Sequence, residues 1–205
     1  MNVSTNAGPS AQDKSNTDAA SAIRQAENRI AAMLGGYPGR SVVYYGGRGV
    51  EKTHLLNAIG KLAKEKNLLC EHIEAKTPLG LVNDIFDISN RIMQDLTSNE
   101  KSFTSVRESR NFDFSNSEEL TELLITLGRK VQQGGFGICF CIDELQCAKK
   151  EDLESLAQAI HRLNQLGLPI LFFCTGSPKI LKDLGNAVSY AERLFEFVKL
   201  GPPVE

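Results

Sequence analysis

Five short runs rich in β-branched, aromatic or other apolar residues recur along the chain, and segments with helical spacing separate them. A short run that is apolar throughout is typical of a strand buried on both of its faces. Strands of this kind that alternate with helices form a mostly parallel sheet covered by helices on two sides. The sequence therefore predicts a three-layer α/β domain. The five runs lie at residues 41–45, 69–73, 138–142, 170–174 and 195–200.

Capping and turn residues mark the ends of several expected helices. Asp18 is placed to cap a first helix that ends at Gly35-Gly36, and Gly167 is placed to end a later one. A polar stretch rich in serine and asparagine, at residues 97–116, predicts a long exposed loop. The remaining expected helices cover residues 52–66, 81–96, 117–134, 152–166 and 187–194.

The turn after the first strand is rich in glycine and precedes a helix, a geometry that points backbone N–H groups at an anion. A phosphate-loop pattern is Gly, four residues, then Gly-Lys-Ser/Thr, and this turn departs from it only at Glu51. Lys52 is placed to reach terminal phosphates and Thr53 to bind Mg²⁺ through its hydroxyl. The alternative is a glycine-rich strand-to-helix turn without a ligand. The predicted contact segment comprises Gly46, Gly47, Arg48, Gly49, Val50, Glu51, Lys52, Thr53 and His54.

A second motif consists of two acids at the end of the apolar run at 138–142. Asp143 and Glu144 would lie at the carboxyl edge of a parallel sheet, where ligands bind in such folds. Asp143 is suited to hold Mg²⁺ and Glu144 to polarise an attacking water. The alternative for the pair alone is helix capping after a strand. Both motifs in this order favour a nucleotide site.

Four segments, GGRGVEKT, ICFCIDELQ, CTGSP and SYAERLFEF, together resemble the AAA-type P-loop ATPase domain of a bacterial and archaeal family similar to origin-recognition and STAND-type ATPases. The resemblance covers about residues 40–203. It implies a five-stranded sheet in the order 5-1-4-3-2, with ATP and Mg²⁺ at the phosphate loop. It also implies nucleotide and metal binding by Lys52 and Thr53, metal binding by Asp143, and water activation by Glu144.

The same resemblance suggests roles for two further residues. Thr175 would sense the γ-phosphate just past the fourth strand, or else satisfy backbone groups at the strand end. Arg193 would reach the ATP of a neighbouring subunit, or else form a surface ion pair with Glu192 or Glu196.

Two departures from the family pattern predict weakened activity. Glu51 adds a Cβ and a negative charge where glycine would allow close approach and a positive φ. Its charge would cost about 4 kcal/mol against one phosphate charge at ~4 Å and an effective dielectric of ~20, unless the side chain turns outward or pairs with Arg48 or Lys52. After the fifth strand only residues 201–205 follow, so the family's helical lid is not expected, and hydrolysis should be slow at best.

Composition bears on the number of domains and on whether the chain binds nucleic acid, spans a membrane or is secreted. The 205 residues suit one domain, with a disordered tail at 1–17 and the ATPase core at 18–205. A net charge of −2 gives no chain-wide basic field for nucleic acid, and no apolar run approaches the ~18 residues of a membrane span. The polar N-terminus is not a secretory signal, and Cys139, Cys141 and Cys174 suit a core in a reducing cytoplasm.

A structural metal site is not predicted. Cys139, Cys141 and Cys147 lack a fourth ligand at zinc spacing, and His54, His72 and His161 lack paired ligands. These histidines are therefore expected in surface or packing roles.

The leading interpretation is an ATP-binding, Mg²⁺-dependent AAA-type ATPase domain that couples nucleotide state to the conformation or assembly of a protein partner, including self-association. An inactive ATPase fold that serves as a protein-interaction module is the alternative, and Glu51 favours it. A DNA-associated ATPase is a third, supported by family analogy alone.

Overall fold

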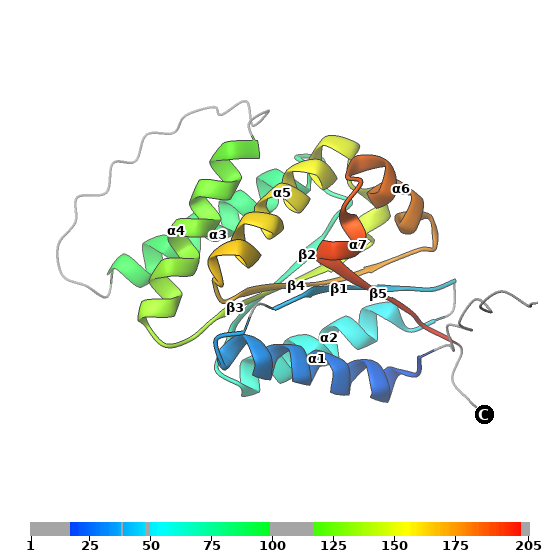
Figure 1. Ribbon diagram of the computed structural model, residues 1–205, viewed down its shortest axis with the longest axis horizontal. Helices are drawn as coiled ribbons and strands as arrows, with labels where there is room; N and C mark the ends of the chain where they lie inside the picture. Colours follow the sequence, from blue (N-terminus) through cyan, green and yellow to red (C-terminus); the bar gives the residue numbers. More distant parts are fainter. Residues whose placement is uncertain (1–16, 38, 48–49, 99–116, 202–205) are drawn as a thin grey trace, which may run out of the picture.

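The computed structural model describes residues 17–37, 39–47, 50–98 and 117–201. Within them, five strands form one sheet in which every neighbouring pair is parallel (Figure 1). The strand order β2-β3-β4-β1-β5 is the predicted order 5-1-4-3-2 counted from the opposite edge, so that prediction is confirmed. The strands are β1 (Ser41–Tyr45), β2 (Leu69–Glu74), β3 (Ile138–Asp143), β4 (Ile170–Gly176) and β5 (Phe195–Lys199).

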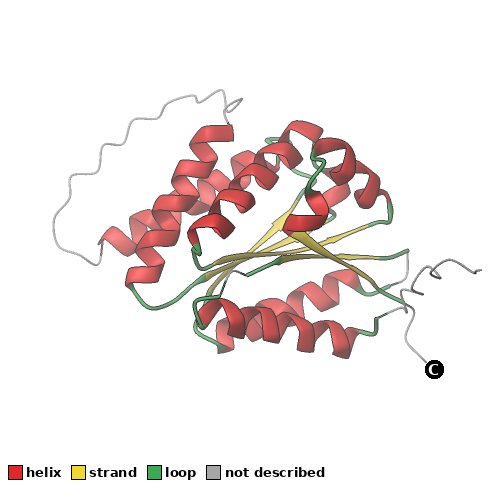
Figure 2. Cartoon of the chain, in the orientation of Figure 1, coloured by secondary structure: helices red, strands yellow, loops and turns green. Residues whose placement is uncertain are grey.

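Helices cover both faces of the sheet (Figure 2). One face carries α1 (Ala19–Leu34) and α2 (Lys52–Glu65). The other carries the rest, and a short 3₁₀ helix, η1 (Leu145–Cys147), follows β3. The fold is therefore the predicted three-layer α/β arrangement. The helices of the second face are α3 (Leu81–Ser98), α4 (Ser117–Gln133), α5 (Lys150–Leu166), α6 (Lys179–Ala187) and α7 (Ala191–Leu194).

The core has two parts, one on each side of the sheet, and β3 contributes to both. Phe140 belongs to the cluster beneath α3–α7, where its ring stacks on Phe172 at a centroid distance of 5.1 Å. Cys139 and Cys141, which point to the opposite face, belong to the cluster beneath α1 and α2. All these side chains are fully buried, so the apolar run reflects burial on both faces.

Local signals fixed several helix ends as expected. The Asp18 carboxylate accepts a hydrogen bond from the Ser21 N–H at 2.6 Å and caps α1. Gly167 ends α5 with φ +61°, a left-handed conformation that glycine adopts without a Cβ clash.

The prediction for the last helical segment is wrong. A helix was expected at residues 187–194, but the chain forms α6 before this segment and only the four-residue α7 within it. Val188 separates the two helices because its backbone is extended. Helix α6 buries Ile180 and Leu184, four residues apart, a pattern too short to stand out in the sequence.

Two irregular segments were also predicted, and most of their residues lie outside the described ranges. Of the predicted tail, only Thr17 is described, and it is paired: its N–H donates to the Lys199 carbonyl at 2.9 Å. Of the predicted loop at 97–116, residues 97 and 98 instead extend α3. Among the helices described, none combines the length and apolar character that a membrane span requires.

Candidate functional site

The carboxyl ends of β3 and β4 meet the first turn of α2 at one edge of the sheet, where the Asp143 carboxylate accepts three hydrogen bonds, one of them from the Glu144 N–H at 2.9 Å. The Thr53 hydroxyl donates to Asp143 Oδ2 at 2.6 Å, and the Thr175 hydroxyl donates to Asp143 Oδ1. The structure thus brings three of the predicted site residues together at one carboxylate. Two of them, Thr53 and Thr175, are more than a hundred positions apart in the chain.

Thr175 lies within β4, where it pairs with Tyr44 of β1, and not past the strand as expected. It is fully buried, and its hydroxyl reaches the Asp143 carboxylate. The alternative interpretation expected the Thr175 side chain to bond backbone groups at the end of the strand. In the structure it donates to the Asp143 carboxylate instead.

The phosphate loop holds the Lys52 ammonium at its own backbone. Lys52 Nζ donates to the carbonyls of Gly46 and Gly47 at 3.1 and 2.9 Å. These bonds keep the positive charge at the turn between β1 and α2. The neighbouring Arg48 and Gly49 of the predicted contact segment lie outside the described residues.

The backbone at Glu51 does not need glycine in this conformation. Glu51 has φ −73° and ψ 57°, and the Lys52 N–H donates to the Val50 carbonyl at 2.7 Å. This is an inverse γ-turn, which L-residues adopt readily. The positive φ that glycine would allow at this position is therefore not used in the conformation observed.

The Glu51 side chain turns outward, one of the two outcomes expected to lower its electrostatic cost. It is 73% exposed, and its Oε2 lies 3.5 Å from Nδ1 of His54 rather than beside Lys52. Water around an exposed carboxylate screens its repulsion of an anion, so the cost is smaller than the unscreened value of about 4 kcal/mol.

Glu144 is held in an unusual backbone conformation at the start of η1. Its φ of 55° and ψ of 40° lie in the left-handed region, which costs a non-glycine residue roughly 1–2 kcal/mol. Its side chain makes no capping hydrogen bond to η1, contrary to the capping alternative. Strain of this kind persists only where surrounding contacts impose it.

Gln146, which the sequence analysis did not single out, supplies such a contact. Its Nε2 donates to Glu144 Oε2 at 2.7 Å, and its Oε1 accepts the Ser177 N–H at 2.9 Å. The amide therefore fixes the Glu144 carboxylate relative to the end of β4. The only available signal was its position two residues after the acid pair.

A cavity of about 250 Å³ opens between the first turn of α2 and Glu144. Part of the predicted contact segment lines it, and Gly46 and Gly47 adjoin it through their hydrogen bonds with Lys52. The oxygen atoms of Thr53 and Asp143 are of the kind that Mg²⁺ prefers, and unpaired N–H groups of a helix start favour phosphate. The residues present therefore fit both groups. The lining residues are Val50, Glu51, Lys52, Thr53, His54 and Glu144.

Arg193 lies on α7 with an exposed side chain. The alternative, an ion pair with Glu196, does not form among the described residues: Glu196 instead accepts hydrogen bonds from Gln25 and Arg29. Within the described part of the chain, Arg193 forms no ion pair with Glu192 either.

No protein-family model and no curated protein matches the chain. Solved structures match it across most of its length. The ORC2 protein of Aeropyrum pernix, in its ADP form, has a TM-score of 0.51 and 16% identity, over 91% of this chain and 48% of that one. The Aeropyrum pernix ORC1 protein in complex with DNA has a TM-score of 0.53 and 13% identity, over 89% and 45%. The Pyrobaculum aerophilum Cdc6p has a TM-score of 0.53 and 15% identity, over 87% and 45%.

These likenesses establish the fold, and the chain spans just under half of each solved protein. The chain therefore has the fold of an AAA-type P-loop ATPase domain, as its sequence motifs predict.

Proposed function

We propose that this chain is an ATP-binding, Mg²⁺-dependent ATPase domain of the AAA type, with its core at residues 18–205, that couples nucleotide state to the conformation or assembly of a protein partner. The observation that carries the proposal is the contact between the two motifs. Thr53 of the phosphate loop is hydrogen-bonded to Asp143 of the acid pair at 2.6 Å. An oxygen pair of this kind, beside a lysine and a helix start, is suited to Mg²⁺ and phosphate together.

Each site residue has a distinct task in this proposal. Lys52 exchanges its two carbonyl contacts for phosphate oxygens, while Thr53 and Asp143 hold Mg²⁺. When bound, Mg²⁺ neutralises charge that develops on the transferred phosphoryl group. Glu144 orients the attacking water, and Thr175 senses the γ-phosphate through the same carboxylate that binds the metal.

Arg193 is proposed to act on ATP bound by a neighbouring subunit. Its exposed position on α7 leaves the guanidinium accessible to another chain. An arginine supplied from a neighbour stabilises transition-state charge in phosphoryl transfer.

We propose that Glu51 weakens ATP affinity. Glu51 lines the same cavity as Lys52 and Thr53, so it brings a negative charge close to where a polyanion would bind. The outward turn of the side chain reduces this effect without removing it, because the charge stays at the rim.

The test is a titration of the chain with ATP, with and without Mg²⁺, by calorimetry. Lys52→Ala should weaken binding at least ~10-fold, since it removes the charge nearest the phosphates. Lys61→Ala, on the exposed side of the same helix, is the matched control and should bind as the native chain does. Glu51→Gly should bind more tightly. Equal affinity in the native chain and in Lys52→Ala would refute the assigned site.

The alternative function, an inactive fold that binds protein partners, is favoured by the charge at Glu51. It predicts no ATP binding by the native chain and restored binding in Glu51→Gly. Absence of binding in both chains would contradict the nucleotide site altogether.

A further inference from the structure

A second group of chemically reactive side chains lies away from the phosphate loop, on β2 and β3. In the parallel register, Cys70 is opposite Cys139 and His72 is opposite Cys141. Residues two apart on a strand share a face, so these four side chains form a two-by-two array. We call them the Cys–His cluster. It lies on the face of the sheet covered by α2, with Cys139 and Cys141 in the core there and Cys70 packed against it.

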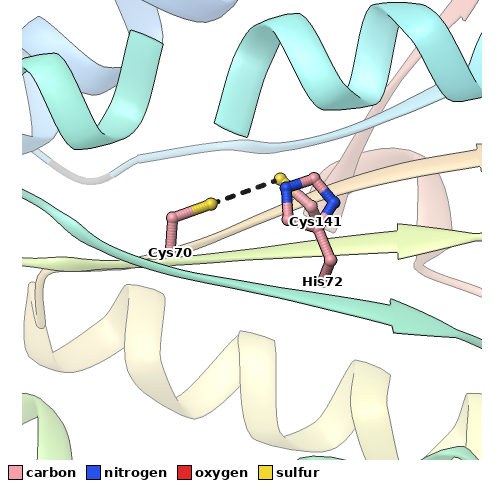
Figure 3. A group of neighbouring side chains, drawn as sticks. All are labelled: Cys70, His72 and Cys141. Atoms are coloured by element: carbon pink, nitrogen blue, oxygen red, sulfur yellow. Dashed lines mark hydrogen bonds between the residues drawn. The ribbon is translucent and has the colours of Figure 1, made fainter. Parts of the chain in front are cut away.

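Three members of the cluster, Cys70, His72 and Cys141, are spaced for a shared metal ion rather than for a disulfide. The sulfur of Cys141 lies 3.8 Å from that of Cys70 and 4.0 Å from that of Cys139. The ligand atoms of Cys70, His72 and Cys141 all lie within 4.8 Å of one another. In Figure 3 the Cys70 sulfur points toward the Cys141 sulfur, and the His72 ring lies beside Cys141. Two sulfurs bound at ~2.3 Å to a tetrahedral zinc are ~3.8 Å apart, whereas a disulfide requires ~2.05 Å.

Gly60 of α2 leaves room for the cluster. A Cβ at this position would lie 2.3 Å from Nε2 of His72 and 3.3 Å from the sulfur of Cys70. Glycine inside a helix costs about 1 kcal/mol relative to alanine. The close approach of the imidazole and the thiol explains why this buried helical position lacks a side chain.

The cluster is open to solvent on one side. Strand β2 is at the edge of the sheet, His72 is exposed and Cys70 is half-buried, while Cys139 and Cys141 are fully buried. An ion can therefore enter from the edge and be enclosed by the deeper thiols.

We propose that the Cys–His cluster binds one Zn²⁺ ion, with Cys70, His72 and Cys141 as ligands and Cys139 as the fourth. Sulfur and imidazole donors select Zn²⁺ over Mg²⁺, whereas the oxygen donors of Thr53 and Asp143 have the opposite preference. Each thiol that becomes a ligand releases its proton to solvent. The ion joins edge strand β2 to β3 beneath α2, so its binding free energy stabilises the folded chain.

The test uses the reduced chain after treatment with a chelator, with Mg²⁺ in excess to fill any oxygen site. Co²⁺ is added as a spectroscopic probe, and Zn²⁺ is then titrated against a coloured chelator. The native chain should show the visible bands of tetrahedral Co²⁺ and the charge-transfer band of thiolate ligation, both removed by one equivalent of Zn²⁺. Zn²⁺ should also raise the thermal unfolding midpoint.

Cys70 and His72 are the accessible members of the cluster, so substituting them leaves the buried core intact. Cys70→Ser and His72→Gln should each weaken Zn²⁺ binding at least ~10-fold and lose the rise in unfolding midpoint. Cys147→Ser is the matched control, because Cys147 is an exposed free thiol outside the cluster, and it should bind as the native chain does. Circular dichroism verifies that each variant is folded.

Two results would overturn the proposal. One is the absence of tetrahedral Co²⁺ bands in the native chain, including the case in which its thiols instead oxidise to a disulfide in air. The other is equal Zn²⁺ affinity in Cys70→Ser, His72→Gln and the native chain. Neither result depends on ATP, so the nucleotide site and the zinc site succeed or fail separately.

Discussion

The two faces of strand β3 differ in chemistry, although both are buried. Ile138, Phe140 and Ile142 belong to the aliphatic and aromatic core beneath α3–α7. Cys139 and Cys141 belong to the core beneath α1 and α2, and Asp143 continues that side of the strand to reach Thr53. One face is large, apolar and unreactive, while the other carries small thiols and an acid.

On β3, the reactive side chains therefore lie on one face of the sheet and the large apolar side chains on the other. The face toward α2 meets the phosphate loop at the carboxyl end of the strands and the Cys–His cluster further back. The opposite face fills its space with large side chains such as Phe140 and Phe172. We therefore expect substitution of Phe140 to change the free energy of unfolding but not ligand binding, and substitutions at the Cys–His cluster to change ligand binding.

The largest expected effect tests the apolar face. Phe140→Ala removes a fully buried ring that stacks on Phe172, so it should lower the free energy of unfolding by about 3–5 kcal/mol in urea denaturation. Because this variant can fail to fold, Phe140→Leu accompanies it, with a smaller loss of roughly 1–2 kcal/mol and unchanged Zn²⁺ affinity. Weakened Zn²⁺ binding in the folded Phe140→Leu chain would contradict the claim that this face of β3 does not affect ligand binding.

An intermediate effect tests the face toward α2. Gly60→Ala places a methyl group against His72 and should weaken Zn²⁺ binding at least ~10-fold, or about 1.4 kcal/mol, in the competition titration. Gly185→Ala is the matched control, since Gly185 is an exposed helical glycine of α6 with open space around it. The control should keep its Zn²⁺ affinity and gain up to about 1 kcal/mol of stability. Equal Zn²⁺ affinity in both variants would remove the steric role assigned to Gly60.

The smallest expected effect concerns the start of helix α3, which lies on the same side of the sheet as Phe140. Asp152 of α5 accepts the Leu81 N–H at 3.0 Å at the start of α3. Asp152→Ala should lower the free energy of unfolding by about 1 kcal/mol, because that N–H loses its acceptor. Asp152→Asn keeps an acceptor oxygen and should lose less, and both variants should bind ATP and Zn²⁺ as the native chain does.

The same residue gives a pH dependence with a defined sign. Burial raises the pKa of the Asp152 carboxyl above its ordinary value of 3.8. Its contribution to stability is therefore fully present below 3.8 and is lost as the pH rises through the higher pKa of the folded chain. Urea denaturation across this window should show a steeper loss with rising pH in the native chain than in Asp152→Asn. Parallel curves for the two chains would contradict the assignment.

Contiguous patterns predicted the fold well, together with the turn between β1 and α2 that carries Lys52 and Thr53. The apolar runs marked all five strands, Asp18 and Gly167 marked helix ends, and the motif resemblance supplied the strand order. These features depend on residues close together in the chain, because strand burial, capping and loop geometry are local. Helix α6 was missed because its apolar spacing is brief and the adjacent Val188 interrupts the helical pattern.

The sequence by itself determined which residues are chemically able to act, and the tertiary structure decided which of them meet. The phosphate loop is readable from the sequence because Lys52 and Thr53 are neighbours on one turn, whereas Thr175 was tied to Asp143 only by the pairing of β4 with β3. The Cys–His cluster could not be predicted for the same reason. Cys70 and Cys139 are far apart in the chain, and only the parallel register places them side by side beneath Gly60. Register is set by packing of whole strand faces, a property that no short motif records.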